Sequence, residues 1–205
     1  SINNATKFFT KYQFERGLIM DKVKFGIKNV HFFPMNAYIS AVPTYGTVID
    51  VPGAVSLSLS AQGDINKFYA DNIVYFQTSA NNGYEGDLNV ALIPDDVYEE
   101  IFGYSKDTND VITEDASATS KAFAMTFEED GVQTGTKFVM YNCTATRPSR
   151  DLNTIEDTKT PTTQTLTVSA APLKNGKVMA MTGANTPDGV KSAWHNSVYL
   201  SPATP

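Results

Sequence analysis

Apolar and polar positions alternate along most of the chain, as they do in β-strands. From Asp21 onward, short alternating runs are separated by Gly, Pro, Asn and Asp turn signals. This pattern predicts strands over Lys22 to Val30 with a continuation over His31 to Ile39, Ala54 to Ser60, Asn72 to Ser79, Asp87 to Ile93, Lys121 to Glu128, Thr136 to Thr146, Thr162 to Ala171 and Val178 to Met181. The expected fold class is mainly β, a β-sandwich or partly closed barrel of antiparallel strands.

Two connections carry hairpin signals. Asn81-Asn82-Gly83 contains an Asn-Gly step, which favours a tight reversal, and it predicts that Asn72 to Ser79 pairs with Asp87 to Ile93. Glu129-Asp130-Gly131 predicts a second hairpin between the strands that flank it. The run Ala54 to Ser60 places apolar residues on one face and only serines on the other, so its serine face is a candidate for contact with another sheet or subunit.

One segment has the helical period. After Pro94, apolar residues recur at helical spacing over Asp95 to Phe102, with acids in the first turn and Gly103 as a stop signal. The sequence predicts one α-helix flanking the strands.

The two ends of the chain differ from its middle. Ser1 to Ile19 has three basic residues, one acid and no strand alternation. We interpret 1–19 as a non-native leader before a natural start at Met20, or as an arm whose Phe8, Tyr12 and Phe14 pack on a neighbour. We expect the folded domain over 20–182 and a C-terminal arm over 183–205. Within the domain, the Pro- and Gly-rich loop Ala41 to Pro52 is a candidate arm.

The amino-acid composition narrows the class of protein to which the chain can belong. A chain of 205 residues with 41% hydrophobic and 19% charged residues fits one ordinary globular domain. The 16 basic and 22 acidic residues give a net charge of -6, the opposite of what phosphate neutralisation requires. Tight binding of nucleic acid is therefore not expected.

Possible catalytic features each have a simpler structural interpretation. Two histidines and one cysteine, His31, His195 and Cys143, cannot complete a zinc site without carboxylates. Cys143 lies in an alternating strand, where a cysteine is usually a small packed residue. Asp95 and Asp96 stabilise a helix start and need no further role. We therefore predict a protein that is not an enzyme and has no cofactor or metal.

Five segments resemble those of the major tail tube proteins of long-tailed phages and prophages of Gram-positive bacteria. They are Lys22 to His31, Ile49 to Leu57, Phe68 to Asn72, Asn81 to Leu88 and Tyr141 to Pro148, in the same order and with similar spacing. The resemblance runs from about Met20 to about Met181. None of these segments is a catalytic signature.

The resemblance implies a structural subunit that forms stacked hexameric rings around a DNA channel. Its implied partners are other copies of itself and tail proteins such as the tape measure and tail terminator, in the virion tail after assembly in the host cytoplasm. It also implies that DNA passes through the channel without specific binding and that no membrane is a partner. The early loop of that family contacts the next ring, and the matching candidates here are Val42, Pro43, Tyr45, Val48 and Ile49. The acidic composition adds candidates for lumen acids on strands or strand ends: Asp71, Asp87, Glu128 and Glu129.

Two other classes stay open. A secreted or surface β-sandwich adhesin or binding module would share the threonine-rich β composition, and a signal peptide would favour it. A small carbohydrate-active enzyme would need two carboxylates facing each other across a cleft.

Overall fold

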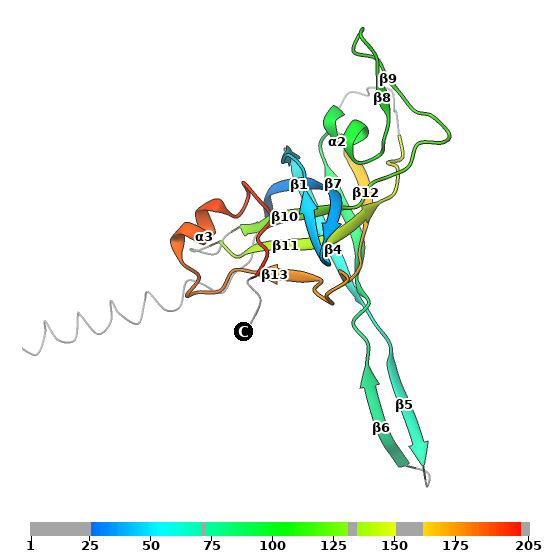
Figure 1. The fold of residues 1–205 in the computed structure, drawn as a ribbon, viewed down its shortest axis with the longest axis vertical. Helices are drawn as coiled ribbons and strands as arrows, with labels where there is room; N and C mark the ends of the chain where they lie inside the picture. Colours follow the sequence, from blue (N-terminus) through cyan, green and yellow to red (C-terminus); the bar gives the residue numbers. More distant parts are fainter. Residues whose placement is uncertain (1–25, 71–72, 131–134, 151–161, 202–205) are drawn as a thin grey trace, which may run out of the picture.

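A curled antiparallel sheet dominates the structure (Figure 1). The computed structural model describes residues 26–70, 73–130, 135–150 and 162–201. The strand order is β2-β1-β10-β11-β12-β7-β4, with β3 beside β1 and β13 beside β11. The strands are β1 (Gly26–Ile39), β2 (Val42–Tyr45), β3 (Ile49–Asp50), β4 (Ala54–Gln62), β7 (Gly83–Val90), β10 (Phe123–Asp130), β11 (Lys137–Ala145), β12 (Gln164–Ala170) and β13 (Met179–Met181). The predicted fold class, mainly β and antiparallel, is confirmed.

Smaller elements surround this sheet. Two separate strand pairs are β5 (Ile65–Ala70) with β6 (Ile73–Ser79), and β8 (Ser105–Lys106) with β9 (Ile112–Thr113). The helices in the described residues are α2 (Asp95–Glu100) and α3 (Asp188–Ala193). Helix α2 is the flanking helix that the sequence predicts, whereas α3 was not predicted.

The main core lies inside the curl of the sheet. Apolar side chains from β1, β7, β10, β11 and β12 meet Val97, Ile101 and Phe102 there, and the ring centroids of Phe32 and Phe123 are 4.6 Å apart. Strands β1 and β4 lie close to each other at the open side of the curl, but β4 pairs only with β7. Two hollows of about 350 and 400 Å³ follow this seam between β1 and β4. The sheet is therefore only partly closed.

A second, smaller core covers the opposite face of β1, β10 and β11. Phe33, Val139 and Tyr141 project from the sheet and are covered by Trp194 and the residues around it. In Figure 1 this C-terminal segment, residues 183–201 with α3, lies beside the body of the sheet. The sheet is thus sandwiched between the main core with α2 on one face and the C-terminal segment on part of the other.

Helix α2 begins where the sequence indicates and ends at Glu100, two residues before the predicted Phe102. Asp95 and Asp96 occupy its first turn, next to the partial positive charge of the helix start. Gly103 follows with a φ of 71°, a left-handed conformation that glycine adopts without strain, and Tyr104 N donates to the carbonyl of Tyr98 over 3.0 Å. The buried Val97 then fixes the helix over the end of the main core.

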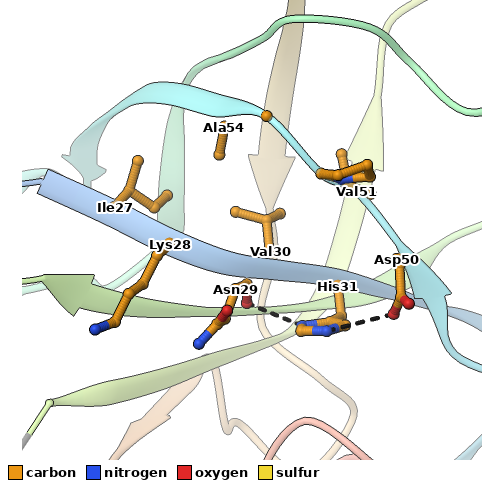
Figure 2. A pocket seen from close by; sticks show the side chains of 10 residues that line it. Ile27, Lys28, Asn29, Val30, His31, Asp50, Val51 and Ala54 are labelled. Carbon is orange, nitrogen blue, oxygen red and sulfur yellow. Dashed lines mark hydrogen bonds and ion pairs between the residues drawn. The ribbon is translucent and has the colours of Figure 1, made fainter.

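Strand β1 contains a bulge at Asn29. The register with β10 shifts between Lys28 and His31, and Asn29 has a φ of 53°. Asparagine tolerates this left-handed conformation better than most residues do. Before the bulge Ile27 faces the main core; after it, Val30 does. The extra residue leaves Lys28, Asn29 and His31 on one side of the strand, as Figure 2 shows.

Strands β4 and β7 are followed by the pair β5 and β6, so the hairpin predicted around Asn82-Gly83 does not form. That prediction is wrong, because β6 pairs with β5 and β7 pairs with β4 and β12. Between the two pairs, Asn82 N donates to Gln62 O over 2.8 Å, so the two chains continue side by side through this region. Gly83 has a φ of 101°, and a Cβ there would lie 1.8 Å from the carbonyl oxygen of Ala170. Its role is to allow close pairing with β12, not to form a turn.

The predicted hairpin of Lys121 to Glu128 with Thr136 to Thr146 is confirmed by the pairing of β10 with β11. The loop Ala41 to Pro52 is more ordered than predicted. It contributes β2 and β3, both paired with β1. The turn between β1 and β2 places Ser40 and Ala41 at φ values of 49° and 65°. A tight turn of this kind favours glycine at such positions, and neither residue is a glycine.

Candidate functional site

A polar surface covers the outer face of β4, β7 and β12, and we call it the hydroxyl face. Its side chains form three cross-strand rows: Ser56, Asn89 and Thr165; Ser58, Asp87 and Thr167; Ser60, Glu85 and Ser169. They are exposed or half-buried. The opposite sides of the same strands contribute apolar residues to the main core, which fixes the orientation of the whole face.

Hydrogen bonds link the strands across this face. Thr167 Oγ1 donates to Asp87 Oδ1 over 2.8 Å, and Asn89 Nδ2 donates to Ser56 Oγ over 2.9 Å. Thr165 Oγ1 donates to Asn89 Oδ1 over 2.5 Å. Such pairs hold the side chains in fixed positions on the pleat. The hydroxyl face is therefore an ordered polar surface.

The hydroxyl face carries two carboxylates and no cation. Asp87, one of the acids that we singled out from the sequence, lies in its centre. Glu85 was missed, although it lies two residues before Asp87 and so must share its face. Small hydroxyls and amides make up the other seven side chains of the three rows. At neutral pH the face presents negative charge only.

The ribbon formed by β5 and β6 projects away from the sheet (Figure 1). These two strands pair only with each other among the described strands. Apolar side chains lie exposed along the ribbon: Ile73 is 62% exposed and Phe76 61%. An isolated two-stranded ribbon has marginal stability in water, and an apolar ribbon with free edges is prone to associate. These features make the ribbon a candidate assembly surface.

The inter-ring candidates do not lie on one free loop. Val42 is 45% exposed near the tip of the β1–β2 turn, whereas Pro43 is buried. Tyr45 donates its hydroxyl to the carbonyl of Tyr141 over 2.8 Å. Val48 packs against the second core and Ile49, 5% exposed, lies in the main core. Of the five candidates, only Val42 is exposed.

The other lumen candidates are scattered. Asp71 lies outside the described residues. Glu129 pairs with Ile27 and lines the seam between β1 and β4. Glu128 is almost completely buried and lies among cations, which differs from the exposed position that we expected. The assignment of these acids to a lumen stays a prediction.

Glu128 is the centre of a polar cluster on the outer face of β1 and β10. Asn29 Nδ2 donates to Glu128 Oε2 over 3.1 Å, so the bulge of β1 supplies one of its partners. Lys28 Nζ lies 3.7 Å from Glu128 Oε1, and Lys137 Nζ lies 3.9 Å from Oε2. A Cβ on Gly135 would lie 2.1 Å from Glu128 Oε1, so the backbone at Gly135 approaches the carboxylate closely. The buried carboxylate is thus well compensated.

Both histidines belong to this cluster. The rings of His31 and His195 are stacked, with centroids 4.8 Å apart. His31 contacts the carbonyl of Asn29 at 2.9 Å and Asp50 Oδ1 at 3.4 Å, as drawn in Figure 2. His195 Nε2 lies 3.6 Å from Glu128 Oε2. No sequence signal indicated that two histidines 164 positions apart would meet.

Cys143, the candidate nucleophile, lies in surroundings that suit a packing role. Cys143 is buried in the main core, and burial raises the pKa of its thiol to about 12, which disfavours the nucleophilic thiolate. Within the described ranges, no three His, Cys, Asp or Glu side chains gather in a way that would hold a metal ion. No helix in the described part of the chain is long and apolar enough to span a membrane.

Comparison with known proteins shows distant structural similarity only. No protein-family model and no curated protein sequence matches the chain. Among solved structures, a chain from a six-fold symmetrised cryo-EM structure of the anti-feeding prophage baseplate is similar over 80% of this chain and 97% of that chain. The two chains are 11% identical, and the TM-score is 0.40.

Proposed function

We propose that this chain is the structural subunit of a phage or prophage tail tube, assembling into stacked hexameric rings around a channel for DNA. The observation that carries the proposal is the hydroxyl face, a fixed polar surface with two carboxylates and no lysine or arginine. The resemblance of five sequence segments to major tail tube proteins supports it independently.

The chemistry of this face suits a surface past which DNA must slide. Lysine and arginine would bind phosphates and release counterions, which is the main source of non-specific DNA affinity. Carboxylates such as Asp87 repel the phosphates instead. Because the Debye length is about 8 Å at physiological salt, only charges on the wall of a narrow channel act on the DNA. Short hydroxyl side chains leave that wall hydrated and smooth.

Assembly of several copies would also cover surfaces that the single chain leaves open. The ribbon has exposed Ile73 and Phe76, and β4 is paired only with β7. Joining strand edges between subunits removes free edges, and a closed barrel has none. The ribbon is longer and more exposed than the tip at Val42, so we assign the main assembly contact to the ribbon.

The proposal includes the rest of the tail. The partners are further copies of this chain and other tail proteins such as the tape measure and the tail terminator. The site of action is the virion tail, after assembly in the host cytoplasm, and no cofactor takes part.

Electron microscopy of the concentrated purified protein tests this function. Rings of about six subunits or tubes are expected. A protein that stays monomeric at high concentration, under conditions where its fold is intact, would contradict the proposal.

A charge-reversal pair tests which face lines the channel. Glu85→Lys with Asp87→Lys is expected to give tubes that retain duplex DNA in a salt-dependent manner. The control is Asp95→Lys with Asp96→Lys, which makes the same change of charge at two exposed acids of α2. DNA retention by the control tubes, and not by the first pair, would show that the hydroxyl face is not the channel wall.

A further inference from the structure

Two adjacent residues, Trp194 and His195, hold the C-terminal segment on the sheet. The first does so by apolar packing and the second by polar contacts. Trp194 enters the second core, donates its Nε1 proton to Phe138 O over 3.1 Å, and stacks on Tyr199 at 5.1 Å. His195 enters the polar cluster, where its Nδ1 lies 3.1 Å from Thr126 Oγ1. A change at His195 therefore acts directly on the neighbouring tryptophan.

The surroundings of His195 favour a neutral ring. Its Nε2 is buried and has no hydrogen-bond partner among the described residues. The Glu128 carboxylate at 3.6 Å favours the tautomer with the proton on Nε2, and Thr126 then donates to Nδ1. A second proton on Nδ1 would remove the acceptor for that hydroxyl.

The charges around the ring oppose protonation. The charged and titratable groups that face His195 directly or through one neighbour are His31 and Lys28 on β1, Asp50 on β3, Glu128 and Asp130 on β10, and Lys137 on β11. Glu128 is the one buried carboxylate in this set, and both lysines already share it. Lys137 is also fixed by the C-terminal segment, since its Nζ donates to Lys191 O over 2.9 Å.

Burial and the nearby His31 and Lys137 lower the pKa of His195 to about 4, although Glu128 acts in the opposite direction. A lowered pKa means that the released segment binds more protons than the docked one. The docked state is therefore fully favoured above the ordinary imidazole pKa of about 6.5 and loses stability as pH falls towards 4.

We propose that residues 183–201 form an acid-released flap, held on β1, β10 and β11 by neutral His195 and detached when His195 is protonated. The main core lies on the other face of the sheet and contains no residue of the flap. Release therefore uncovers Phe33, Val139 and Tyr141 while the sheet stays folded. Local opening of this kind occurs where a segment has few buried contacts of its own. The inference does not depend on the proposed function.

Trp194 is the only tryptophan in the chain, so its fluorescence reports on docking of the flap. With a pKa of about 6.5 when released and about 4 when docked, the ratio of released to docked flap rises about 25-fold between pH 7 and pH 5. A red shift of the emission is expected over this range, with an unchanged far-ultraviolet circular dichroism signal from the sheet.

Substitutions at the two histidines test whether the pH-dependent shift of the Trp194 emission arises from His195. His195→Gln is expected to abolish the shift, and His31→Gln to reduce it because a neighbour that lowers the pKa of His195 is removed. A shift that persists in His195→Gln, or that disappears in His31→Gln alone, would overturn the assignment to His195.

Two results with the unsubstituted protein would also overturn the proposal. One is an emission that stays constant to pH 4 in the folded protein. The other is a red shift that coincides with loss of the circular dichroism signal, which would mean global unfolding. If His195→Gln does not fold at neutral pH, nuclear magnetic resonance titration of the two imidazoles decides. A His195 ring that titrates near the ordinary value of about 6.5 would refute the mechanism.

Discussion

Ile49 and Val42 lie in the same predicted loop but in opposite surroundings, which allows a sharp test of what this segment does. Ile49 is 5% exposed in the main core, whereas Val42 is 45% exposed near a turn. Ile49→Ala removes three buried carbon groups, each worth about 0.8 kcal/mol, and leaves a partly unfilled cavity, so we expect a loss of about 3 kcal/mol. Val42→Ala should change the free energy of unfolding by less than about 0.5 kcal/mol.

Urea denaturation followed by Trp194 fluorescence measures both changes at neutral pH. Ile49→Ala should lower the midpoint with an unchanged m value, and the melting temperature should fall by about 6 to 12 °C. A loss within about 0.5 kcal/mol of zero for Ile49→Ala would refute the reasoning, because the segment would then behave as a free arm. Equal losses for the two variants would be evidence against the burial difference itself.

Three other substitutions probe the bulge, the sheet and the ribbon. Asn29→Ala should destabilise the protein by about 1 kcal/mol more than Asn29→Gly in urea denaturation, because glycine keeps the left-handed backbone conformation at no steric cost; equal effects would contradict this. Gly86→Val should abolish soluble expression, since even a Cβ would lie 1.7 Å from the carbonyl oxygen of Ser58, and a soluble, stable variant would show that β4 and β7 can separate. Ile73→Ser with Phe76→Ser should keep the melting temperature within about 2 °C but prevent tube growth in electron micrographs, because both side chains are exposed in the single chain; tubes of normal length would exclude the ribbon from assembly.

Local patterns predicted most of the strands but only one of the two hairpin pairings correctly. The alternation in Ala54 to Ser60 gave the right strand and the right faces for Leu57, Leu59 and the serines, because a half-buried strand repeats every two residues. Val55 differs, since it is 58% exposed beside a register shift. The error at Asn82-Gly83 has a different cause. A glycine with positive φ is needed both in tight turns and where a second backbone approaches closely, and only the position of Ala170 distinguishes the two.

The candidate site was predictable in part. Asp87 could be placed on a polar strand face from its own neighbours, and the serines of β4 from theirs. Their union into one face depends on β4, β7 and β12 lying side by side, which is set by contacts between distant parts of the chain. Glu128 shows the same limit, since nothing in Phe127-Glu128-Glu129 reveals that one acid is buried among lysines from other strands.

The bulge at Asn29 divides β1 into two halves that are out of phase. Odd-numbered Ile27 and even-numbered Val30 and Phe32 point into the same core, so the inserted residue acts as a frameshift in the pattern of inside and outside. Deleting Asn29 would restore one unbroken alternation, because Ile27, Val30 and Phe32 would still point into the core and the single residues between them would point out. A related chain without this residue is therefore expected to keep the same order of polar and apolar residues before the deletion, with an uninterrupted period of two across it. A one-residue gap that joins the two alternating runs into one would identify the same strand in sequences too divergent to align by identity.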